Sequence, residues 1–379
     1  MISPGQTVGI LGGGQLGRMT ILAGRPLGLQ FKVFEPAPNC TAGKVADGTY
    51  TAAYSDYSAL DAFAAEVDVV TLEFENIEAS ALEQLESLRP VRPRREVLYT
   101  TQHRLREKQF LKSEEIPHVP FVVATDAESL IRGLSQIGLP AVIKTAAFGY
   151  DGKGQRKIEE GEFVDAAQLW VELGEPPAVV IEKWIPFQME LSVICARNLD
   201  GSSTCFPVAE NIHVNHILHQ SLVPARADES VQQTCRELAS KLADRLAVVG
   251  LLAVEFFLTE SGEVLVNEMA PRPHNSGHFT MDACQTSQFE QLLRMVCGMP
   301  AGDPKLHAPV VMTNILGDAW TSGEPDWAVL LGSSRCSLHL YDKGEPRPGR
   351  KMGHFNVLGD TLEGAKQQAD TLFENLMGG

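Results

Sequence analysis

The chain is poor in basic residues relative to acidic ones. Its 379 residues include 32 Lys and Arg against 48 Asp and Glu, which gives a formal net charge of −16. A surface of that sign argues against nucleic acid or an anionic membrane as a partner. The sequence also lacks an apolar run of membrane-spanning length and an N-terminal basic segment followed by a signal-peptide core. These absences predict a soluble, cytoplasmic protein.

The cysteines form no recognisable pattern. Seven are scattered along the chain, an odd number, and no CxxC pair occurs. We therefore expect the reduced thiols of a cytosolic protein, and neither a disulfide framework nor a zinc site. The sequence has no internal repeat and no low-complexity tract, and it is long enough for two or three domains. The cysteines are Cys40, Cys195, Cys205, Cys235, Cys284, Cys297 and Cys336.

The most informative stretch that is present runs from residue 251 to residue 278. Apolar runs on both sides of Ser261 and Gly262 predict two strands joined by a tight turn. If the turn is centred between these two residues, antiparallel partners have residue numbers that sum to 523. Glu255 then lies opposite Glu268, on the same face of the sheet.

Two facing carboxylates need an explanation. Like charges side by side destabilise a hairpin, and apolar surroundings add a desolvation cost. A bound divalent cation removes both objections, and Mg²⁺ suits the pair because it is held by one or two carboxylates plus substrate phosphates and water. The segment then enters a polar loop that places Arg272, His274, Asn275 and Ser276 beside the proposed metal. The alternative is a solvent-exposed hairpin whose carboxylates are simply hydrated.

The N-terminal segment is predicted to form the start of a parallel α/β sheet. A strand at residues 7–11 leads into the glycine-rich turn GGGQLG, residues 12–17, and then into a helix. Such a turn exposes N–H groups that can bind a phosphate or carboxylate, although glycine there can also serve close packing alone. A later strand carries Glu73 near its carboxyl end, where ligands bind in open α/β sheets. Glu75 and Asn76 either line that crevice or cap the next helix.

A second glycine-rich loop follows a strand that ends at Lys144. Its glycines, Gly149, Gly152 and Gly154, permit backbone angles that let N–H groups wrap phosphate oxygens, while Lys144 and Lys153 neutralise charge. The Walker A spacing is absent. We therefore expect a flexible lid between two hairpin strands.

The stretch at residues 179–194 supplies an apolar strand that ends at Glu182 and Lys183, followed by Trp184 and Ile185 and then by Glu190. Backbone groups beside flat apolar side chains suit an adenine, and the later carboxylate suits ribose hydroxyls. A plain strand and linker is the alternative.

Other polar residues have weaker interpretations. His213, His216 and His219 are spaced by three, but structural or substrate-gating histidines are favoured over a zinc site. Arg104 and Lys108 form a basic helix face that either meets a nucleotide or is solvated.

A cluster of cations near the C-terminus stands out in an acidic chain. The loop between residues 339 and 354 is rich in Gly and Pro and holds Lys343, Arg347, Arg350 and Lys351. A fixed phosphate or carboxylate ligand explains this concentration better than a solvated turn. Pro- and Arg-rich residues near 88–95 and a linker at 301–307 indicate domain boundaries.

Taken together, these segments resemble the ATP-grasp pattern of a lysine with a glycine-rich lid, an adenine-type strand and paired glutamates on late strands. The more specific resemblance is to the N5-carboxyaminoimidazole ribonucleotide synthetase family. It is carried by GGGQLGRM, GYDGKGQ, NEMAPRPHNSGH, TSQFEQ and RPGRKMGH, in the family's order and over nearly the whole chain. NEMAPRPHNSGH and RPGRKMGH are highly specific, whereas GGGQLG is not.

The resemblance implies an α/β ATP-grasp fold with three parts, usually assembled as a homodimer. Residues 1–98 are expected to form a Rossmann-like pre-ATP-grasp domain without a dinucleotide. Residues 99–300 are expected to form the ATP-grasp domain, with a lid subdomain at about 118–185. Residues 301–379 are expected to form a small C-terminal domain.

The resemblance also implies a role for individual residues. Magnesium would be held by Glu255 and Glu268. The nucleotide would be bound by Arg104, Lys144, Gly149, Tyr150, Asp151, Gly152, Lys153, Gly154, Gln155, Glu182, Lys183, Trp184, Ile185, Glu190, His213, Asn267 and Glu268. The ribonucleotide would meet Gln15, Glu73, Tyr150, Asp151, Asn275, Ser276, Lys343, Arg350 and Lys351. Bicarbonate would lie near Arg272, His274 and Asn275.

The implied reaction is the ATP-dependent carboxylation of 5-aminoimidazole ribonucleotide with bicarbonate. Carboxyphosphate forms first, and the products are N5-carboxyaminoimidazole ribonucleotide, ADP and phosphate. Asp151 is assigned as the base, and Lys153, Arg272 and His274 as further catalytic residues. One departure is Ala146, Ala147 and Phe148, where some relatives carry Arg and Gly. Another ATP-grasp ligase, acting on formate or biotin, and a regulatory nucleotide-binding module without turnover are the alternatives.

Overall fold

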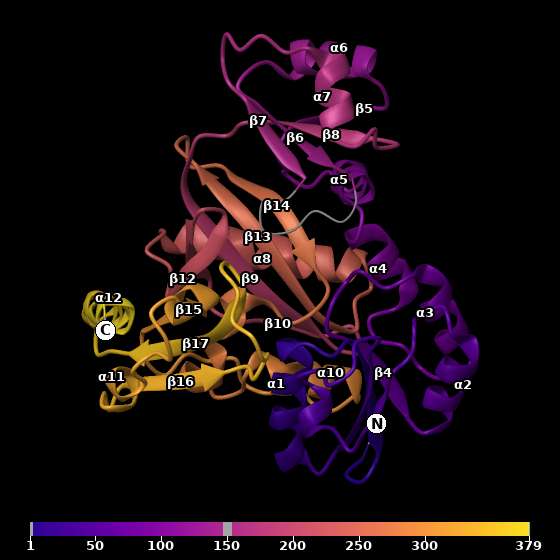
Figure 1. Cartoon of the computed structure of the whole chain (residues 1–379), viewed down its shortest axis with the longest axis vertical. Helices are drawn as coiled ribbons and strands as arrows, with labels where there is room; N and C mark the ends of the chain where they lie inside the picture. Colours follow the sequence, from indigo (N-terminus) through magenta and orange to yellow (C-terminus); the bar gives the residue numbers. More distant parts are fainter. Residues whose placement is uncertain (1–2, 147–153, 379) are drawn as a thin grey trace.

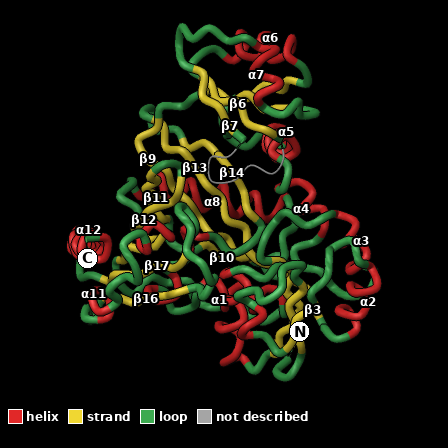
Figure 2. The backbone as a smooth tube through the Cα atoms, in the orientation of Figure 1, coloured by secondary structure: helices red, strands yellow, loops and turns green. Residues whose placement is uncertain are grey.

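The structure is a computed structural model that describes residues 3–146 and 154–378. The described residues form three β-sheets, and Figure 1 shows them as an N-terminal unit, a small unit at the opposite end and a large central sheet between them. Figure 2 shows helices on the outside of each unit. No helix in the described ranges has both the length and the apolar character to cross a membrane.

The N-terminal sheet is parallel, with strand order β3-β2-β1-β4. The predicted strand at residues 7–11 is confirmed as β1, and its apolar side chains are buried between helices. The elements are β1 (Thr7–Leu11), α1 (Gln15–Gly24), β2 (Gln30–Phe34), β3 (Gly48–Tyr50), α2 (Tyr57–Ala65), β4 (Val69–Leu72), α3 (Ala79–Glu86) and α4 (Arg95–Thr101).

The small unit holds an antiparallel sheet of order β5-β8-β6-β7 with two helices against it. Strands β6 and β7 pair directly, Lys144 opposite Gln155, so the glycine-rich segment joins two neighbouring strands as expected. The elements are α5 (Arg104–Ser113), β5 (Phe121–Ala124), α6 (Ala127–Ile137), β6 (Ala141–Thr145), β7 (Gln155–Ile158), α7 (Ala166–Glu172) and β8 (Val179–Lys183).

The central sheet is antiparallel and runs β14-β13-β9-β11-β12-β15-β17-β16, with β10 beside β9. The last three strands come from the C-terminal segment, which therefore extends this sheet through the pairing of β12 with β15. The strands are β9 (Phe187–Arg197), β10 (Ser203–Cys205), β11 (Ala209–Val214), β12 (Ile217–Val223), β13 (Gly250–Thr259), β14 (Val264–Ala270), β15 (Val310–Leu316), β16 (Cys336–Leu340) and β17 (Lys351–Leu358). The helices are α8 (Glu229–Arg245), α9 (Thr280–Ala283), α10 (Gln288–Val296), α11 (Ala328–Leu331) and α12 (Leu362–Met377).

One continuous apolar core joins the N-terminal and central sheets. It contains Ile10 and Phe31 from the N-terminal sheet, Leu293 from α10, and Ile194 and Leu251 from the central sheet. This shared core fixes one face of the N-terminal sheet against the strands that carry the candidate site.

The hairpin of β13 and β14 confirms the predicted pairing of Glu255 with Glu268, with a different turn from the one expected. The turn is centred on Ser261, because the Thr259 N–H donates to the Glu263 carbonyl at 2.9 Å. Partner numbers near the turn therefore sum to 522, and a β-bulge that leaves Asn267 unpaired restores 523 from Glu255 onward.

Candidate active site

A cavity of about 1030 Å³ lies where the three sheets meet. Its lining comes from the N-terminal loop at residues 73–76, from α5, from the small sheet, and from the strands β9, β13 and β14. The volume is at the upper end of ordinary ligand sites, so it accommodates a nucleotide together with a second substrate.

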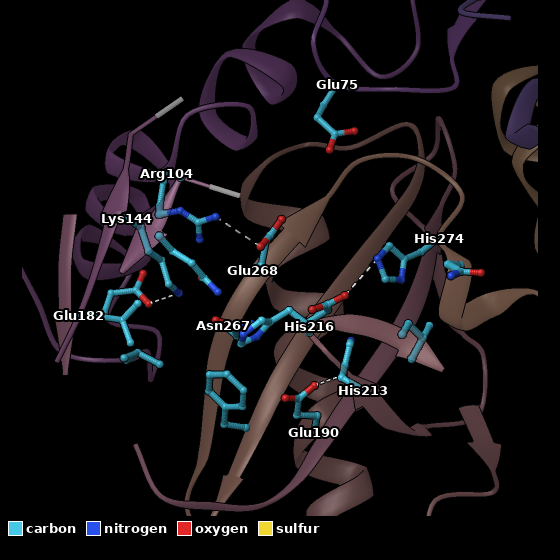
Figure 3. Close-up of a pocket in the computed structure, with 18 of the residues that line it drawn as sticks. Glu75, Arg104, Lys144, Glu182, Glu190, His213, His216, Asn267, Glu268 and His274 are labelled. Atoms are coloured by element: carbon cyan, nitrogen blue, oxygen red, sulfur yellow. Dashed lines mark hydrogen bonds and ion pairs between the residues drawn. The ribbon is translucent and has the colours of Figure 1, made fainter. Parts of the chain in front are cut away.

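The two facing carboxylates reach into this cavity. Glu255 forms an ion pair with His274, Oε1 to Nε2 at 3.0 Å, and Glu268 lies 3.8 Å from the guanidinium of Arg104 (Figure 3). Burial alone would raise the pKa of Glu255, but the hydrogen bond and charge of His274, together with His213 and Lys351, outweigh it and lower that pKa to about 2. Glu255 is therefore ionised at neutral pH.

A divalent cation fits this pair. The described ranges contain no group of three or more His, Cys, Asp or Glu side chains placed to hold a metal on their own. A metal at Glu255 and Glu268 would thus need further oxygen ligands from a bound phosphate or water, which is how Mg²⁺ is usually held. The hairpin is not solvent-exposed as a whole, since both residues line the cavity and Val254, Val266 and Met269 around them are buried, while the Glu268 side chain itself is 46% exposed.

A chain of charges continues from the hairpin into the small sheet. The buried carboxylate of Glu182 accepts from Lys144 at 2.5 Å (Figure 3). It also lies 3.3 Å from the Nζ of Lys108. Burial would raise the pKa of Glu182, but Lys108, Lys144 and Arg104 outweigh it and lower the pKa to about 2. Lys144 lines the cavity, as predicted for a phosphate-binding cation. Both interpretations of Lys108 as a solvated or nucleotide-facing residue are wrong, because its side chain is completely buried.

The strand end at Lys183, Trp184 and Ile185 lines the cavity beside an aromatic pair. Phe187 and Phe257 stack with ring centroids 4.7 Å apart and also line it. These two aromatic residues were not predicted from the sequence. For Phe257 a signal exists, because it lies two residues from Glu255 on one strand and therefore shares its face.

The three histidines do not converge. His213 forms an ion pair with Glu190, and His216 lines the cavity at the tip of the β11–β12 hairpin. His219 packs against Phe373 of α12, with ring centroids 4.8 Å apart. The zinc interpretation is therefore not supported, while His213 and Glu190 lie together in the cavity as the resemblance implied.

The pair of His213 and Glu190 predicts a pH-dependent contribution to stability. Burial would lower the pKa of His213, but Glu190 outweighs it and raises that pKa above its ordinary 6.5. The pair therefore stabilises the fold fully below pH 6.5 and loses this effect as pH rises through the raised pKa. We expect His213→Gln to cost up to about 1 kcal/mol at pH 6 and less at pH 9, measured by urea unfolding.

His219 provides a control of opposite sign. Burial lowers its pKa, so its neutral form contributes stability above pH 6.5 that is lost as pH falls through the lowered folded pKa. His219→Gln should therefore be more costly at pH 9 than at pH 6. An equal cost of His213→Gln at both values would show that its ion pair contributes nothing.

The N–H groups of the N-terminal glycine-rich turn donate hydrogen bonds to carboxyl groups of the same chain. Glu73 accepts from the N–H groups of Gly14 at 2.6 Å and Gly17 at 3.0 Å, and Glu35 accepts from Gly13 at 2.8 Å. Burial raises the pKa of Glu73 against these hydrogen bonds. The space in which a dinucleotide phosphate would lie is therefore filled. Glu73 and Gln15 both line the cavity.

Glu75 connects the N-terminal unit to the polar loop after β14. Its carboxylate accepts two hydrogen bonds from Arg272, one of them 2.9 Å from Nη2, and both side chains line the cavity. Burial would raise the pKa of Glu75, but the charge of Arg272 outweighs it and the pKa is lowered. The helix-cap alternative for Glu75 is therefore wrong, whereas Asn76 lines the cavity.

A side chain of α10 fixes the backbone of the polar loop after β14. Gln288, from the TSQFEQ segment, is fully buried and bonds both the N–H and the carbonyl of His274 at 2.9 Å. The hydroxyl of Ser276 contacts Nδ1 of His274 at 2.9 Å. Ser276 is not among the residues that line the cavity. Asn275 does line it, and both of its amide atoms are buried without a hydrogen-bond partner among the described residues, as is Oδ1 of Asn267.

The remaining predicted residues divide into three groups. Gly154, Gln155 and Lys351 line the cavity. Lys343 and Arg350 do not: the Nζ of Lys343 lies 5.6 Å from the ring centroid of Tyr341, and Arg350 donates to the Glu345 carbonyl at 3.0 Å. The predictions for Gly149, Tyr150, Asp151, Gly152 and Lys153 fall outside the described residues, as do Ala147 and Phe148.

Comparison with known protein families accounts for all three parts. The ATP-grasp domain family matches residues 109–289, and the ribonucleotide synthetase preATP-grasp domain family matches residues 5–102. The phosphoribosylaminoimidazole carboxylase C-terminal domain family matches residues 310–368. The exact domain boundaries stay a prediction.

Relatives and solved structures agree. The N5-carboxyaminoimidazole ribonucleotide synthase of Bacillus subtilis is 44% identical, over 94% of this chain and 93% of that protein. An ADP complex of an N5-carboxyaminoimidazole ribonucleotide synthetase matches with a TM-score of 0.92 and 42% identity, covering 98% of this chain and 97% of that one. The Aspergillus clavatus enzyme in complex with ADP and 5-aminoimidazole ribonucleotide has a TM-score of 0.87 at 29% identity and 98% coverage of both chains.

Fold and cavity together define an ATP-grasp ligase. Within that class, the chain belongs to the N5-carboxyaminoimidazole ribonucleotide synthetase family.

Proposed function

We propose that the cavity binds ATP, bicarbonate and 5-aminoimidazole ribonucleotide together and that the protein carboxylates the exocyclic amine of the ribonucleotide. The observation that supports this most is that one cavity contains Glu255 facing Glu268, the unpartnered amide oxygen of Asn267 and the unpartnered amide group of Asn275. Buried amide atoms without partners are costly, and a polar ligand removes that cost.

The nucleotide would lie between the small sheet and the central sheet. Its adenine would contact the strand end at Trp184 and Ile185, above the stacked ring of Phe257. Glu190, held by His213, would accept from ribose hydroxyls. Lys144 and Arg104 would neutralise the phosphates from one side.

Glu255 and Glu268 would hold Mg²⁺ beside the terminal phosphates. When bound, the ion supplies positive charge to the oxygens of the transferring phosphoryl group. Phosphoryl transfer depends mainly on positioning and charge neutralisation, so the fixed side chains around it determine the rate. The ion pair of His274 with Glu255 keeps that carboxylate ionised and oriented.

Bicarbonate would lie near Arg272, His274 and Asn275. One of its oxygens attacks the γ-phosphorus, the bond to the ADP oxygen breaks, and carboxyphosphate forms. The bridging C–O bond of carboxyphosphate then breaks and gives carbon dioxide and phosphate. The amine nitrogen of the ribonucleotide forms the new N–C bond to carbon dioxide and loses a proton. Asp151 is our proposal for the proton acceptor and Lys153 for a further cation. Gln15, Glu73 and Lys351, which line the cavity, would contact the ribonucleotide, and Lys343 and Arg350 stay part of this proposal on the family resemblance alone.

Phosphate release tests the assignment. We expect the purified protein with Mg²⁺, ATP and bicarbonate to release phosphate at least about tenfold faster when 5-aminoimidazole ribonucleotide is added, since the amine traps carbon dioxide and drives turnover. Formate with a formyl acceptor, or biotin, should give no such increase. No phosphate release under any of these conditions would support the regulatory-module alternative instead.

Three further properties belong to the same proposal. The cation is Mg²⁺, the protein acts in the cytoplasm, and it assembles as a homodimer. The first rests on two carboxylates without a third His, Cys, Asp or Glu ligand among the described residues. The second rests on composition and the third on the family resemblance alone.

A further inference from the structure

The facing pair of carboxylates depends on the β-bulge in β14. In a regular strand, successive side chains point to opposite faces, yet Asn267 and Glu268 both line the cavity. Without the extra residue, the register next to the turn would place Asn267 opposite Glu255 and turn Glu268 to the other face. Keeping this bulge in place is therefore a requirement of the site.

Two consecutive residues of α5 hold the main chain at that point. The Nζ of Lys108 donates to the Asn267 carbonyl at 3.0 Å, and Oε1 of Glu107 accepts from the Met269 N–H at 2.5 Å. These carbonyl and N–H groups belong to the two peptide groups on either side of the Glu268 Cα. The helix thus holds the peptide plane before Glu268 and the one after it.

The need to satisfy unpaired backbone groups on the edge of the sheet does not explain why two buried ionisable side chains, Glu107 and Lys108, bond to β14. β14 is an edge strand, and nearer the turn its Val266 N–H is satisfied by an uncharged group, the Pro117 carbonyl, at 2.9 Å. Glu107 is 2% exposed and Lys108 0%, so each would carry a large desolvation cost in its charged form, and burial together with the charge of Glu268 raises the pKa of Glu107 to about 8. In the described residues, the bonds of these two side chains to β14 fall on the two peptides that flank Glu268.

Lys108 also connects the bulge with the nucleotide side of the cavity. It lies 3.3 Å from Glu182, which in turn accepts from Lys144 at 2.5 Å. The carboxylate end and the phosphate-binding lysine are therefore linked through one buried side chain. The position of β14 relative to the small sheet is fixed by the same contacts.

We infer that Glu107 and Lys108 are positioning residues that hold the β14 bulge so that Glu268 faces Glu255 across a shared cation. The inference rests on the proposed metal-binding role of Glu268. Neither side chain lines the cavity, so both act through the backbone of β14.

The test measures cation binding directly, with Mn²⁺ in place of Mg²⁺ and ADP as the nucleotide, by the loss of free Mn²⁺ signal in electron paramagnetic resonance. Glu107→Leu and Lys108→Met should each weaken Mn²⁺ binding to the ADP complex about tenfold or more, as loss of groups that support metal ligands does. Glu107→Gln should bind like the unchanged protein, since its amide oxygen still accepts from Met269 N–H. Lys112→Met, an exposed position on the same helix, is the matched control.

Kinetics give a second, independent measurement. The Mg²⁺ concentration for half-maximal rate should rise in Glu107→Leu and Lys108→Met, while the KM for the ribonucleotide stays within about threefold because its contacts are untouched. Native Mn²⁺ affinity in both variants, with native circular dichroism, would overturn the inference. So would Glu107→Gln being as impaired as Glu107→Leu.

Two controls keep the outcomes separate. Glu268→Gln must itself lose Mn²⁺, and if it does not, the proposed metal site fails rather than the positioning inference. If neither Glu107→Leu nor Lys108→Met folds, hydrogen exchange of the Met269 amide in the unchanged protein tests the role of Glu107 instead. Exchange as fast as that of an unpaired edge amide would overturn the role of Glu107, and protection comparable with the paired amides of β14 would support it.

Discussion

Replacing Glu268 with glutamine is expected to reduce kcat for the carboxylation at least about a thousandfold, equivalent to about 4 kcal/mol of transition-state stabilisation. The reason is that one of two facing carboxylates would be lost from a cation that has no third His, Cys, Asp or Glu ligand in the described ranges. The KM for the ribonucleotide should change little, because its predicted contacts lie elsewhere in the cavity. Steady-state phosphate release at saturating ATP, with Mg²⁺ varied, measures both.

The hairpin itself offers the control. Glu263 is an exposed carboxylate at the turn between the same two strands, so Glu263→Gln should leave kcat unchanged. Glu255→Gln should resemble Glu268→Gln, with an added loss because His274 would no longer have an ionised partner. Full ATPase activity in Glu268→Gln would remove the metal assignment and, with it, the reason for the two residues to face each other.

The pairing of these carboxylates could be predicted because strand alternation and turn position leave few registers. The prediction succeeded although its turn was half a residue away from the observed one, since the bulge at Asn267 compensated for the difference. Bulges depend on contacts from distant segments, here from α5, and no local pattern in β14 indicates one. The facing pair was therefore predictable, whereas the extra residue that produces it was not.

Residues with long-range partners were the ones misjudged. Lys108 was read as solvated or nucleotide-facing because a charged residue on a short polar helix is normally exposed, yet it is completely buried. Glu75 was read as a possible cap because it precedes a helix, while its partner Arg272 lies 197 positions later in the chain. Periodicity reports which face of an element is apolar, but it carries no information about which buried charges meet.

The partners of the N-terminal glycine-rich turn could not be predicted from the local sequence either. Its N–H groups bind anions as expected, but the anions are Glu73 and Glu35 of the same chain. Fold-level similarity to a dinucleotide site therefore did not transfer to function, because the site's own side chains fill the phosphate position. Glu73 was correctly placed at the cavity, and its two hydrogen bonds to the turn leave it a fixed edge of that cavity.

The pair of Glu75 and Arg272 separates stability from catalysis. Arg272→Ala should lower the free energy of unfolding by about 2–3 kcal/mol, somewhat less than for a wholly buried pair because the side chains are 19% and 27% exposed. It should also abolish carboxylation, since the guanidinium proposed to hold bicarbonate is gone. Urea unfolding and phosphate release measure the two effects. Arg272→Lys should recover part of the stability, because one charge–charge contact survives without the two-point geometry.

The double variant Arg272→Met with Glu75→Leu separates the effect of Arg272 on stability from its effect on carboxylation. Removing both partners leaves no unpaired buried charge, so most of the lost stability should return while carboxylation stays absent. Its stability should also decline less on acidification, because the lowered pKa of Glu75 makes the native pair stabilising above pH 4.5 and lost as pH falls below it. Recovery of activity in the double variant would mean that Arg272 serves only to neutralise Glu75, and the bicarbonate would then have to be held by His274 and Asn275 alone.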